Sequence, residues 1–134
     1  MDKPRRLGDS ELREIDKITE RIIGRAIEVH RVLRCGLFES LYRSALSIEC
    51  DSAGLVYERE VRVPAVYKGR LLGTFRVDFI VENEVIVEIK SVERMTPVFD
   101  AQVITYLRLT GKHVGLLINF NSRLLKDGIK RFIL

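Results

Sequence analysis

One aspartate, one glutamate and one lysine stand on two consecutive predicted strands in a pattern that could hold a divalent cation beside a phosphate. Asp78 lies deep in an apolar strand, where aspartate is depleted, so its carboxylate must be paired, solvated or bound to a metal. Glu88 and Lys90 lie two residues apart on the next strand and therefore share one face. Magnesium binds through one or two carboxylates plus substrate phosphate. The lysine could then orient or deprotonate a water, or stabilise charge on the phosphate, as phosphodiester hydrolysis requires.

The same residues also admit an ordinary structural interpretation. Asp78 could pair with Arg76 or Lys90 at a solvated sheet edge, and Glu88 and Lys90 could simply point outward from their strand. Short motifs of this kind often match by chance, so the pattern taken alone favours the structural interpretation.

The turn between the two strands separates these interpretations. A two-residue hairpin loop would place Asp78 opposite Val87 and send the Asp78 and Glu88 side chains to opposite faces of the sheet. The two acids share a face only if the loop holds three residues, 82–84, or if a strand carries a bulge. The chemical interpretation therefore predicts one of these irregularities.

Two further pairs of polar side chains share a helix face. Glu39 and Tyr42 are three residues apart, and Gln102 and Tyr106 are four apart. Glu39 could be a metal ligand or could interact with the helix dipole in the first turn. Gln102 and Tyr106 could contact a phosphate or support a carboxylate, or could be a surface amide above a half-buried ring.

The elements that must position these residues follow from the hydrophobic periodicity. It predicts helices over about 10–33 and 38–53, followed by a strand that Pro64 breaks, bulges or confines to a sheet edge. Further strands are predicted at 72–81, 85–90 and 113–120, a helix from Thr96-Pro97 to Gly111, and a short C-terminal helix from Ser122 to about Phe132. The crossover between the last two strands implies a parallel pair in a mixed sheet, and so an α/β fold with helices on the sheet.

Composition sets the broad class. The 134 residues, 46% of them hydrophobic, fit a single domain over residues 1–134, with about the first ten residues flexible. The formal net charge of +4 permits a polyanionic partner without requiring one. No apolar run could span a membrane, and two cysteines with two histidines exclude a structural zinc site and favour the cytoplasm.

Several segments together resemble a known family. Residues 36–42 read G-x-x-E-x-x-Y, and the stretches 66–69, 87–90, 109–111 and 116–120 follow in the expected order. The chain resembles the GxxExxY protein family, of the PD-(D/E)XK nuclease superfamily, from about Ile18 to Ile133.

The resemblance implies a restriction-endonuclease-like αβββαβ core with an added N-terminal helix and a short C-terminal helix. It implies that Asp78, Glu88 and Lys90 are the D…E-x-K motif, and that Glu39 is the additional helical carboxylate of RecB-like nucleases. Gln102 and Tyr106 resemble the Q-x-x-x-Y motif of those enzymes. The implied metal is Mg²⁺, for which Mn²⁺ can substitute, with the ligands Glu39, Asp78 and Glu88. One departure is Val77, where a proline precedes the aspartate in part of the superfamily.

Three functional hypotheses follow. The first is a magnesium-dependent nuclease acting on nucleic acid, with DNA favoured, in which Gln102, Tyr106 and Tyr42 support the substrate or the site. The second is a catalytically silent module on the same fold that binds nucleic acid or protein. The third is a structural subunit of a larger assembly, and a homodimer is also expected as a possible state.

Overall fold

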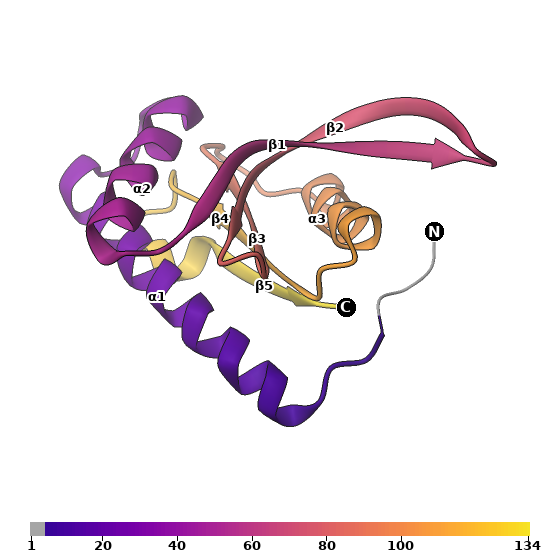
Figure 1. Ribbon diagram of the computed structural model, residues 1–134. Coiled ribbons are helices and arrows are strands. Elements are labelled where there is room, and N and C mark those ends of the chain that lie inside the picture. Colours follow the sequence, from indigo (N-terminus) through magenta and orange to yellow (C-terminus); the bar gives the residue numbers. More distant parts are fainter. Residues whose placement is uncertain (1–4) are drawn as a thin grey trace.

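Five strands form one mixed sheet in the computed structural model, which describes residues 5–134 (Figure 1). Their order in space is the same as their order in the chain, β1-β2-β3-β4-β5. Only β3 and β4 are parallel, and every other neighbouring pair is antiparallel. The strands are β1 Tyr57–Tyr67, β2 Arg70–Val81, β3 Val85–Lys90, β4 Val114–Asn119 and β5 Ile129–Ile133.

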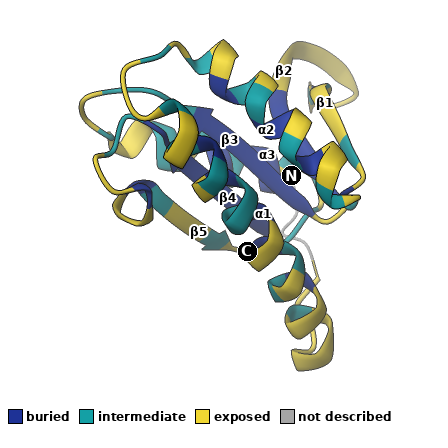
Figure 2. Ribbon diagram, turned by 90° about the vertical axis from the view of Figure 1, so that its left-hand side faces the viewer, coloured by how far each residue is buried: buried dark blue, intermediate teal, exposed yellow. Residues whose placement is uncertain are grey.

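Helices cover both faces of the sheet. Helices α1 (Asp9–Leu33) and α2 (Glu39–Ala53) pack on one face, and α3 (Pro97–Thr110) packs on the other. Strands β3 and β4 lie between these layers and are buried on both faces, as their dark blue colour in Figure 2 shows. The order α2-β1-β2-β3-α3-β4 confirms the predicted αβββαβ core, and α1 confirms the predicted extra N-terminal helix.

The N-terminal end of the described chain leads directly into helix α1. The flexibility predicted for about residues 1–10 stays a prediction; helix α1 begins at Asp9, and Glu11 in its first turn accepts a hydrogen bond from the Gly8 backbone N–H. Residues 1–4 lie outside the described residues. Within residues 5–134, no helix combines the length and the apolar character that crossing a bilayer requires.

The C-terminal segment differs from the prediction. The expected short helix is only one 3₁₀ turn, η1 (Leu125–Gly128), and the chain then continues as β5, antiparallel to β4. In β5, Ile129 packs against the core cluster under α1 and α2, while Phe132 packs against the cluster under α3. This alternation is a strand period, and pairing with the otherwise open edge of β4 outweighs the weak helical pattern.

Strand β1 forms the opposite edge of the sheet. Pro64 lies within β1, where a residue without a backbone N–H is tolerated because the strand has a neighbour on one side only. The β1–β2 register shifts between Ala65 and Val66. Both observations confirm the predicted edge position and irregularity. The Lys68-Gly69 turn, with positive φ at both residues, links β1 to β2 as predicted.

Close packing of α3 on β4 generates a testable prediction. A Cβ atom added at Gly115 would lie 2.8 Å from Val103 Cγ1, and the branched valine in a helix has little rotamer freedom to move away. We expect Gly115→Ala to lower the free energy of unfolding by about 1–3 kcal/mol in urea denaturation, because the helix must shift.

Gly73→Ala is the matched control, because an added Cβ there meets no atom within 4 Å. We expect this variant to be as stable as the unmodified chain or slightly more stable. Equal destabilisation by both substitutions would contradict the tight α3–β4 contact.

Candidate active site

The Asp78 and Glu88 carboxylates lie on the same face at the point where β2 and β3 diverge. The ladder pairs Val81 with Val85 and Phe79 with Val87, so the connecting loop holds three residues, 82–84. Continuing this register places Asp78 opposite Glu88. The three-residue loop, with left-handed backbone at Glu82 and Asn83, is the irregularity that the chemical interpretation predicted.

Each carboxylate accepts a hydrogen bond from the backbone of the other strand. The Asp78 N–H donates to Glu88 Oε1 at 2.8 Å, and the Ile89 N–H donates to Asp78 Oδ2, also at 2.8 Å. The regular β2–β3 ladder ends at the preceding pair, Phe79 and Val87, so these side chains take the place of main-chain acceptors. The reciprocal bonds fix both carboxylates rigidly between the strands.

The second oxygen of each carboxylate remains available. Asp78 Oδ1 and Glu88 Oε2 make no hydrogen bond with residues 5–134. In that part of the chain, Gln102 Oε1 is the one fully buried side-chain oxygen without a partner, so these two carboxylate oxygens keep some contact with solvent. Apolar packing therefore does not seal the acidic pair.

Burial disfavours the charged forms of both acids. Asp78 is 6% exposed and Glu88 is 3% exposed. Burial and then the negative charge of Asp78 raise the pKa of Glu88 to about 8, although the Asp78 N–H and the Lys90 and Arg43 charges oppose the rise. Burial also raises the pKa of Asp78, against the Ile89 N–H and the same two cations. Two close carboxylates of this kind form a site that a cation would stabilise.

Arg43 joins the acidic pair, and the sequence analysis missed it. Its Nη1 atom lies 3.8 Å from Asp78 Oδ1 and 3.6 Å from Glu39 Oε1. Arg43 follows Glu39 by one helical turn on α2, a spacing at which opposite charges meet, so the i,i+4 pattern was the available signal.

Glu39 is the third carboxylate of the expected metal site. Glu39 pairs with Arg43, whose guanidinium also approaches Asp78, and the negative charge of Glu39 acts to raise the pKa of Asp78. Among the described residues, no three His, Cys, Asp or Glu side chains form a group that could hold a metal. The structure therefore brings Asp78 and Glu88 together, with Arg43 near both Asp78 and Glu39, and the role of Glu39 as a metal ligand stays a prediction.

Lys90 lies at the carboxyl end of β3 and within electrostatic range of both acids. Its positive charge acts to lower the pKa of Asp78 and of Glu88. The half-buried side chain places Nζ 4.6 Å from the ring centroid of Phe99, a cation–π contact that restricts the ammonium group. Asn119, opposite Lys90 on β4, holds the next segment by bonds to the Val92 N–H and C=O.

Tyr106 and Gln102 reach the site from α3. Burial and then the Glu88 charge raise the pKa of Tyr106 to about 12, and the Gln102 side chain opposes the rise, so the phenol lies within electrostatic range of the acidic pair. The Phe75 ring packs edge-on against Tyr106 at 5.7 Å between centroids. Gln102 Oε1 is buried with no hydrogen-bond partner in the described chain, so it is an acceptor available beside the site.

Tyr42 lies in the hydrophobic core. Its ring is buried and stacks on Phe120 at 4.6 Å, while its hydroxyl donates to the Arg34 carbonyl at 2.5 Å and accepts from the Leu37 N–H at 3.2 Å. These contacts give Tyr42 a structural role, and its expected part in supporting the substrate or the site stays a prediction. Tyr42 holds the α1–α2 connector, and Ser91 Oγ, just after β3, donates to the carbonyl of Leu37 in that connector.

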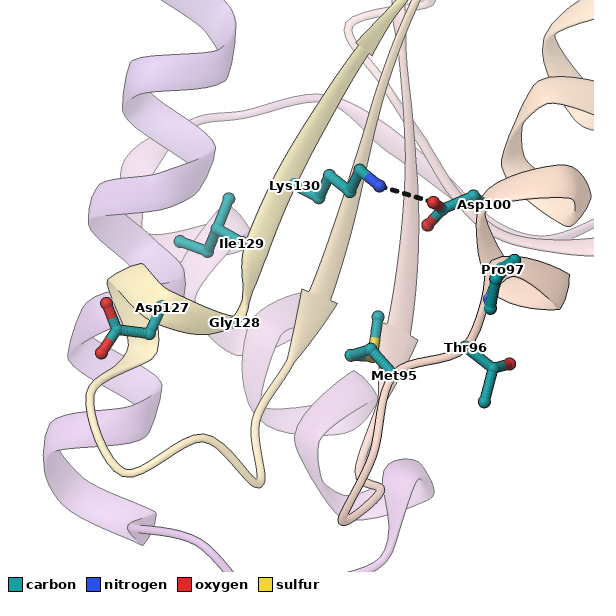
Figure 3. A pocket seen from close by; sticks show the side chains of 8 residues that line it. All are labelled: Met95, Thr96, Pro97, Asp100, Asp127, Gly128, Ile129 and Lys130. Atoms are coloured by element: carbon teal, nitrogen blue, oxygen red, sulfur yellow. Dashed lines mark hydrogen bonds and ion pairs between the residues drawn. The ribbon is translucent and has the colours of Figure 1, made fainter.

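A hollow of about 350 Å³ lies near the start of α3 but away from the acidic pair (Figure 3). Figure 3 shows the Lys130 ammonium pointing across it to Asp100, at 2.5 Å. The Asp78 and Glu88 side chains do not line it. Its lining residues are Met95, Thr96, Pro97, Asp100, Asp127, Gly128, Ile129 and Lys130.

Comparison with known proteins identifies the family. The model of the PD-(D/E)XK nuclease superfamily matches residues 16–132. The chain belongs to the PD-(D/E)XK nuclease superfamily. No curated protein matches it. Among solved structures, it is similar to the crystal structure of an alkaline exonuclease (LHK-Exo) from Laribacter hongkongensis, with 14% identity over 86% of this chain and 81% of that chain and a TM-score of 0.47.

Membership of the PD-(D/E)XK nuclease superfamily agrees with the expected restriction-endonuclease-like fold. The matched range contains β2, β3 and α3, which carry Asp78, Glu88, Lys90, Gln102 and Tyr106. The narrower resemblance to the GxxExxY family stays a prediction, as do the roles of these residues.

The raised pKa of Glu88 predicts an unusual dependence of stability on pH. Because the folded pKa, about 8, lies above the ordinary value of 4.5, this group stabilises the fold fully below pH 4.5 and loses that contribution as the pH rises toward 8. We expect the free energy of unfolding, measured in urea with EDTA, to fall over this range by on the order of a few kcal/mol more than in Glu88→Gln.

Glu84→Gln is the matched control, because Glu84 is exposed in the β2–β3 loop. It should keep the pH dependence of the unmodified chain. If Glu88→Gln shows the same pH dependence as well, the acidic pair does not carry the burial cost that its geometry implies.

Proposed function

We propose that the chain is a divalent-cation-dependent nuclease that hydrolyses phosphodiester bonds in nucleic acid, with DNA as the favoured substrate. The observation that carries this proposal is the pair of carboxylates, Asp78 and Glu88, held by reciprocal backbone bonds beside the Lys90 ammonium. Membership of the nuclease superfamily supports it.

The donor set fits a hard cation. Asp78 Oδ1 and Glu88 Oε2 would hold Mg²⁺ or Mn²⁺, because each is a carboxylate oxygen with no hydrogen bond in residues 5–134. Magnesium needs only one or two protein carboxylates when water and substrate phosphate complete its shell. When bound, the cation would supply Lewis-acid stabilisation of the phosphate and a more acidic water.

The residues around the pair have distinct proposed roles. Lys90 holds a positive charge for the attacked phosphate or removes a proton from the attacking water, with Phe99 restricting the position of its Nζ atom. Gln102 Oε1, an acceptor without a partner in the described chain, accepts a hydrogen bond from that water. Tyr106 keeps its proton at neutral pH, since its pKa is about 12, and donates from the phenol.

Arg43 balances charge in the proposed site. Its guanidinium approaches Asp78 at 3.8 Å and competes with a cation for the same oxygen, Oδ1. Guanidinium groups bind phosphate readily, and the Arg43 guanidinium pairs on its own helix with the partly exposed Glu39. We propose that Arg43 turns to a phosphate of the substrate when a cation takes its place, with Glu39 guiding that movement.

A cleavage assay tests the proposed chemistry. The purified chain is incubated with single- and double-stranded DNA and RNA in Mg²⁺, Mn²⁺ or EDTA. We expect cleavage of DNA with either metal and none in EDTA. Lys90→Ala and Glu88→Gln should each lower the rate at least about 100-fold, because the first removes a positive charge beside the attacked phosphate and the second removes a carboxylate that would hold the cation.

Lys126→Ala and Glu84→Gln serve as controls, because both side chains are exposed and stand outside the site. They should cleave at the rate of the unmodified chain. Loss of cleavage in the controls, or an undiminished cleavage rate in Lys90→Ala, would contradict the proposed site, because another site or another protein would then carry the activity.

A second candidate is a catalytically silent nucleic-acid-binding module on the same fold. The observation that favours it is Arg43, which supplies a cation to Asp78 from within the protein. Binding without metal-dependent cleavage in the assay above would select this alternative.

Both cysteines are free thiols, which supports the reducing cytoplasm as the compartment for either function.

A further inference from the structure

Strands β1 and β2 continue beyond the rest of the sheet as a two-stranded ribbon. The ladder between β2 and β3 covers only Phe79–Val81, whereas β1 and β2 stay paired out to Tyr67 and Arg70. Figure 1 shows this ribbon extending away from the body of the molecule, and we call residues 62–76 the hairpin arm. At about 3.3 Å per residue, its strands are roughly 20 Å long.

The hairpin arm carries positive charge alone. It contains four basic residues and no acidic residue, although the whole chain has 23 basic and 19 acidic residues. The basic residues are Arg62, Lys68, Arg70 and Arg76, and all four are exposed. A local excess of this kind indicates an anionic partner.

The placement of two of these arginines is unfavourable for the isolated fold. Arg62 and Arg76 are direct cross-strand partners, and like charges in that position repel. Glu60 lies 3.6 Å from Arg76, but Arg62 forms no ion pair with the described residues. Their neighbours Val63 and Phe75 pack toward α3, so the two arginines project from the opposite face of the ribbon.

The end of the arm is also apolar and exposed. Val66, Tyr67, Leu71 and Leu72 are 54%, 58%, 64% and 70% exposed, respectively. A cluster of exposed apolar side chains at one end of a ribbon is typical of an interaction site.

We propose that the hairpin arm binds double-stranded nucleic acid next to the acidic pair, its basic side chains contacting phosphates while its apolar tip enters the groove. This inference rests on the proposed function. A two-stranded ribbon fits the major groove of B-DNA, which is about 12 Å wide. Basic side chains along the ribbon would neutralise the phosphates on either side of that groove.

Features of the arm favour a duplex over other occupants. Proteins that bind single strands stack bases on several aromatic rings, whereas the exposed tip offers only Tyr67, whose ring lies 5.3 Å from Lys68 Nζ. A second copy of the chain would bring an arm of equal positive charge against this one, which opposes association through the arm.

The arm and the site belong to one continuous strand. Strand β2 contains both Arg76 and Asp78, and Phe75 at the base of the arm packs on Tyr106. A duplex held by the arm therefore has its backbone close to the two acids.

Binding measurements in EDTA test the arm separately from cleavage. Fluorescence anisotropy would follow a labelled 20-base-pair DNA over about 50–300 mM salt.

The arm variant is Arg62→Gln/Lys68→Gln/Arg70→Gln/Arg76→Gln. The control variant is Arg6→Gln/Arg13→Gln/Arg123→Gln/Lys126→Gln, four exposed residues outside the arm, which lowers the net charge equally. At 100 mM salt the arm variant should bind at least about tenfold more weakly, with a log–log salt slope shallower by about 2–4. The control should stay within about threefold.

A smaller variant, Arg62→Gln/Arg76→Gln, separates binding from folding. It removes a repulsive pair, so it should melt at or above the temperature of the unmodified chain while binding DNA more weakly. Three results would each overturn the proposal. The first is no duplex binding by the unmodified chain, and the second is an equal loss of duplex affinity in the arm and control variants. The third is a 20-base single strand that binds more tightly than the duplex and loses the same affinity in the arm variant. So would a dimer, seen by light scattering, that the arm variant dissociates without losing DNA affinity.

Hydrolysis of bis(4-nitrophenyl) phosphate with Mn²⁺ distinguishes the two proposals, because this small substrate cannot reach the arm and the site together. Arm-dependent duplex binding without Lys90-dependent hydrolysis would sustain the arm and reject the nuclease. Lys90-dependent hydrolysis with unchanged duplex binding in the arm variant would reject the arm alone.

Discussion

Two carboxylates are buried between diverging strands, and each accepts a hydrogen bond from the backbone of the other strand. Burying one ionised carboxylate is costly, and burying two side by side costs more unless cations or donors compensate. The backbone N–H groups of Asp78 and Ile89 compensate in part, and Lys90 and Arg43 supply positive charge. The three-residue turn, the early end of the β2–β3 ladder and the approach of α2 and α3 are all arranged around this pair.

The two helices contribute different chemistry to the same point. From α2 comes the Arg43 guanidinium, paired with Glu39, and from α3 come the phenol of Tyr106 and the Gln102 oxygen, which has no partner in the described chain. The sheet supplies the two carboxylates, held by backbone hydrogen bonds, and the helices supply the surrounding polar groups. The basic ribbon of β1 and β2 would add recognition of a polyanion on the same strand that carries Asp78.

Local patterns predicted much of this arrangement. Period-two alternation and the residues 82–84 predicted strands β2 and β3 and the turn that sets their register, and Thr96-Pro97 marked the start of α3 even though the Thr96 side chain makes no capping bond. The failures were tertiary. Strand β5 depends on the open edge of β4, and the Phe120 ring on which the buried Tyr42 stacks lies far away in the sequence. Arg43 was missed because the charge that it balances, Asp78, lies on a different element.

Calorimetric titration with Mn²⁺ between about pH 6 and pH 8 tests most directly whether the acidic pair is a cation site. A cation must displace the proton that Glu88, with a pKa of about 8, holds at neutral pH. We expect one Mn²⁺ per chain, bound with an affinity that rises with pH over this range. Titrations in two buffers of different ionisation enthalpy should reveal proton release on binding. Asp78→Asn and Glu88→Gln should each abolish binding. Binding that is independent of pH, or that survives both substitutions, would contradict the proposed cation site.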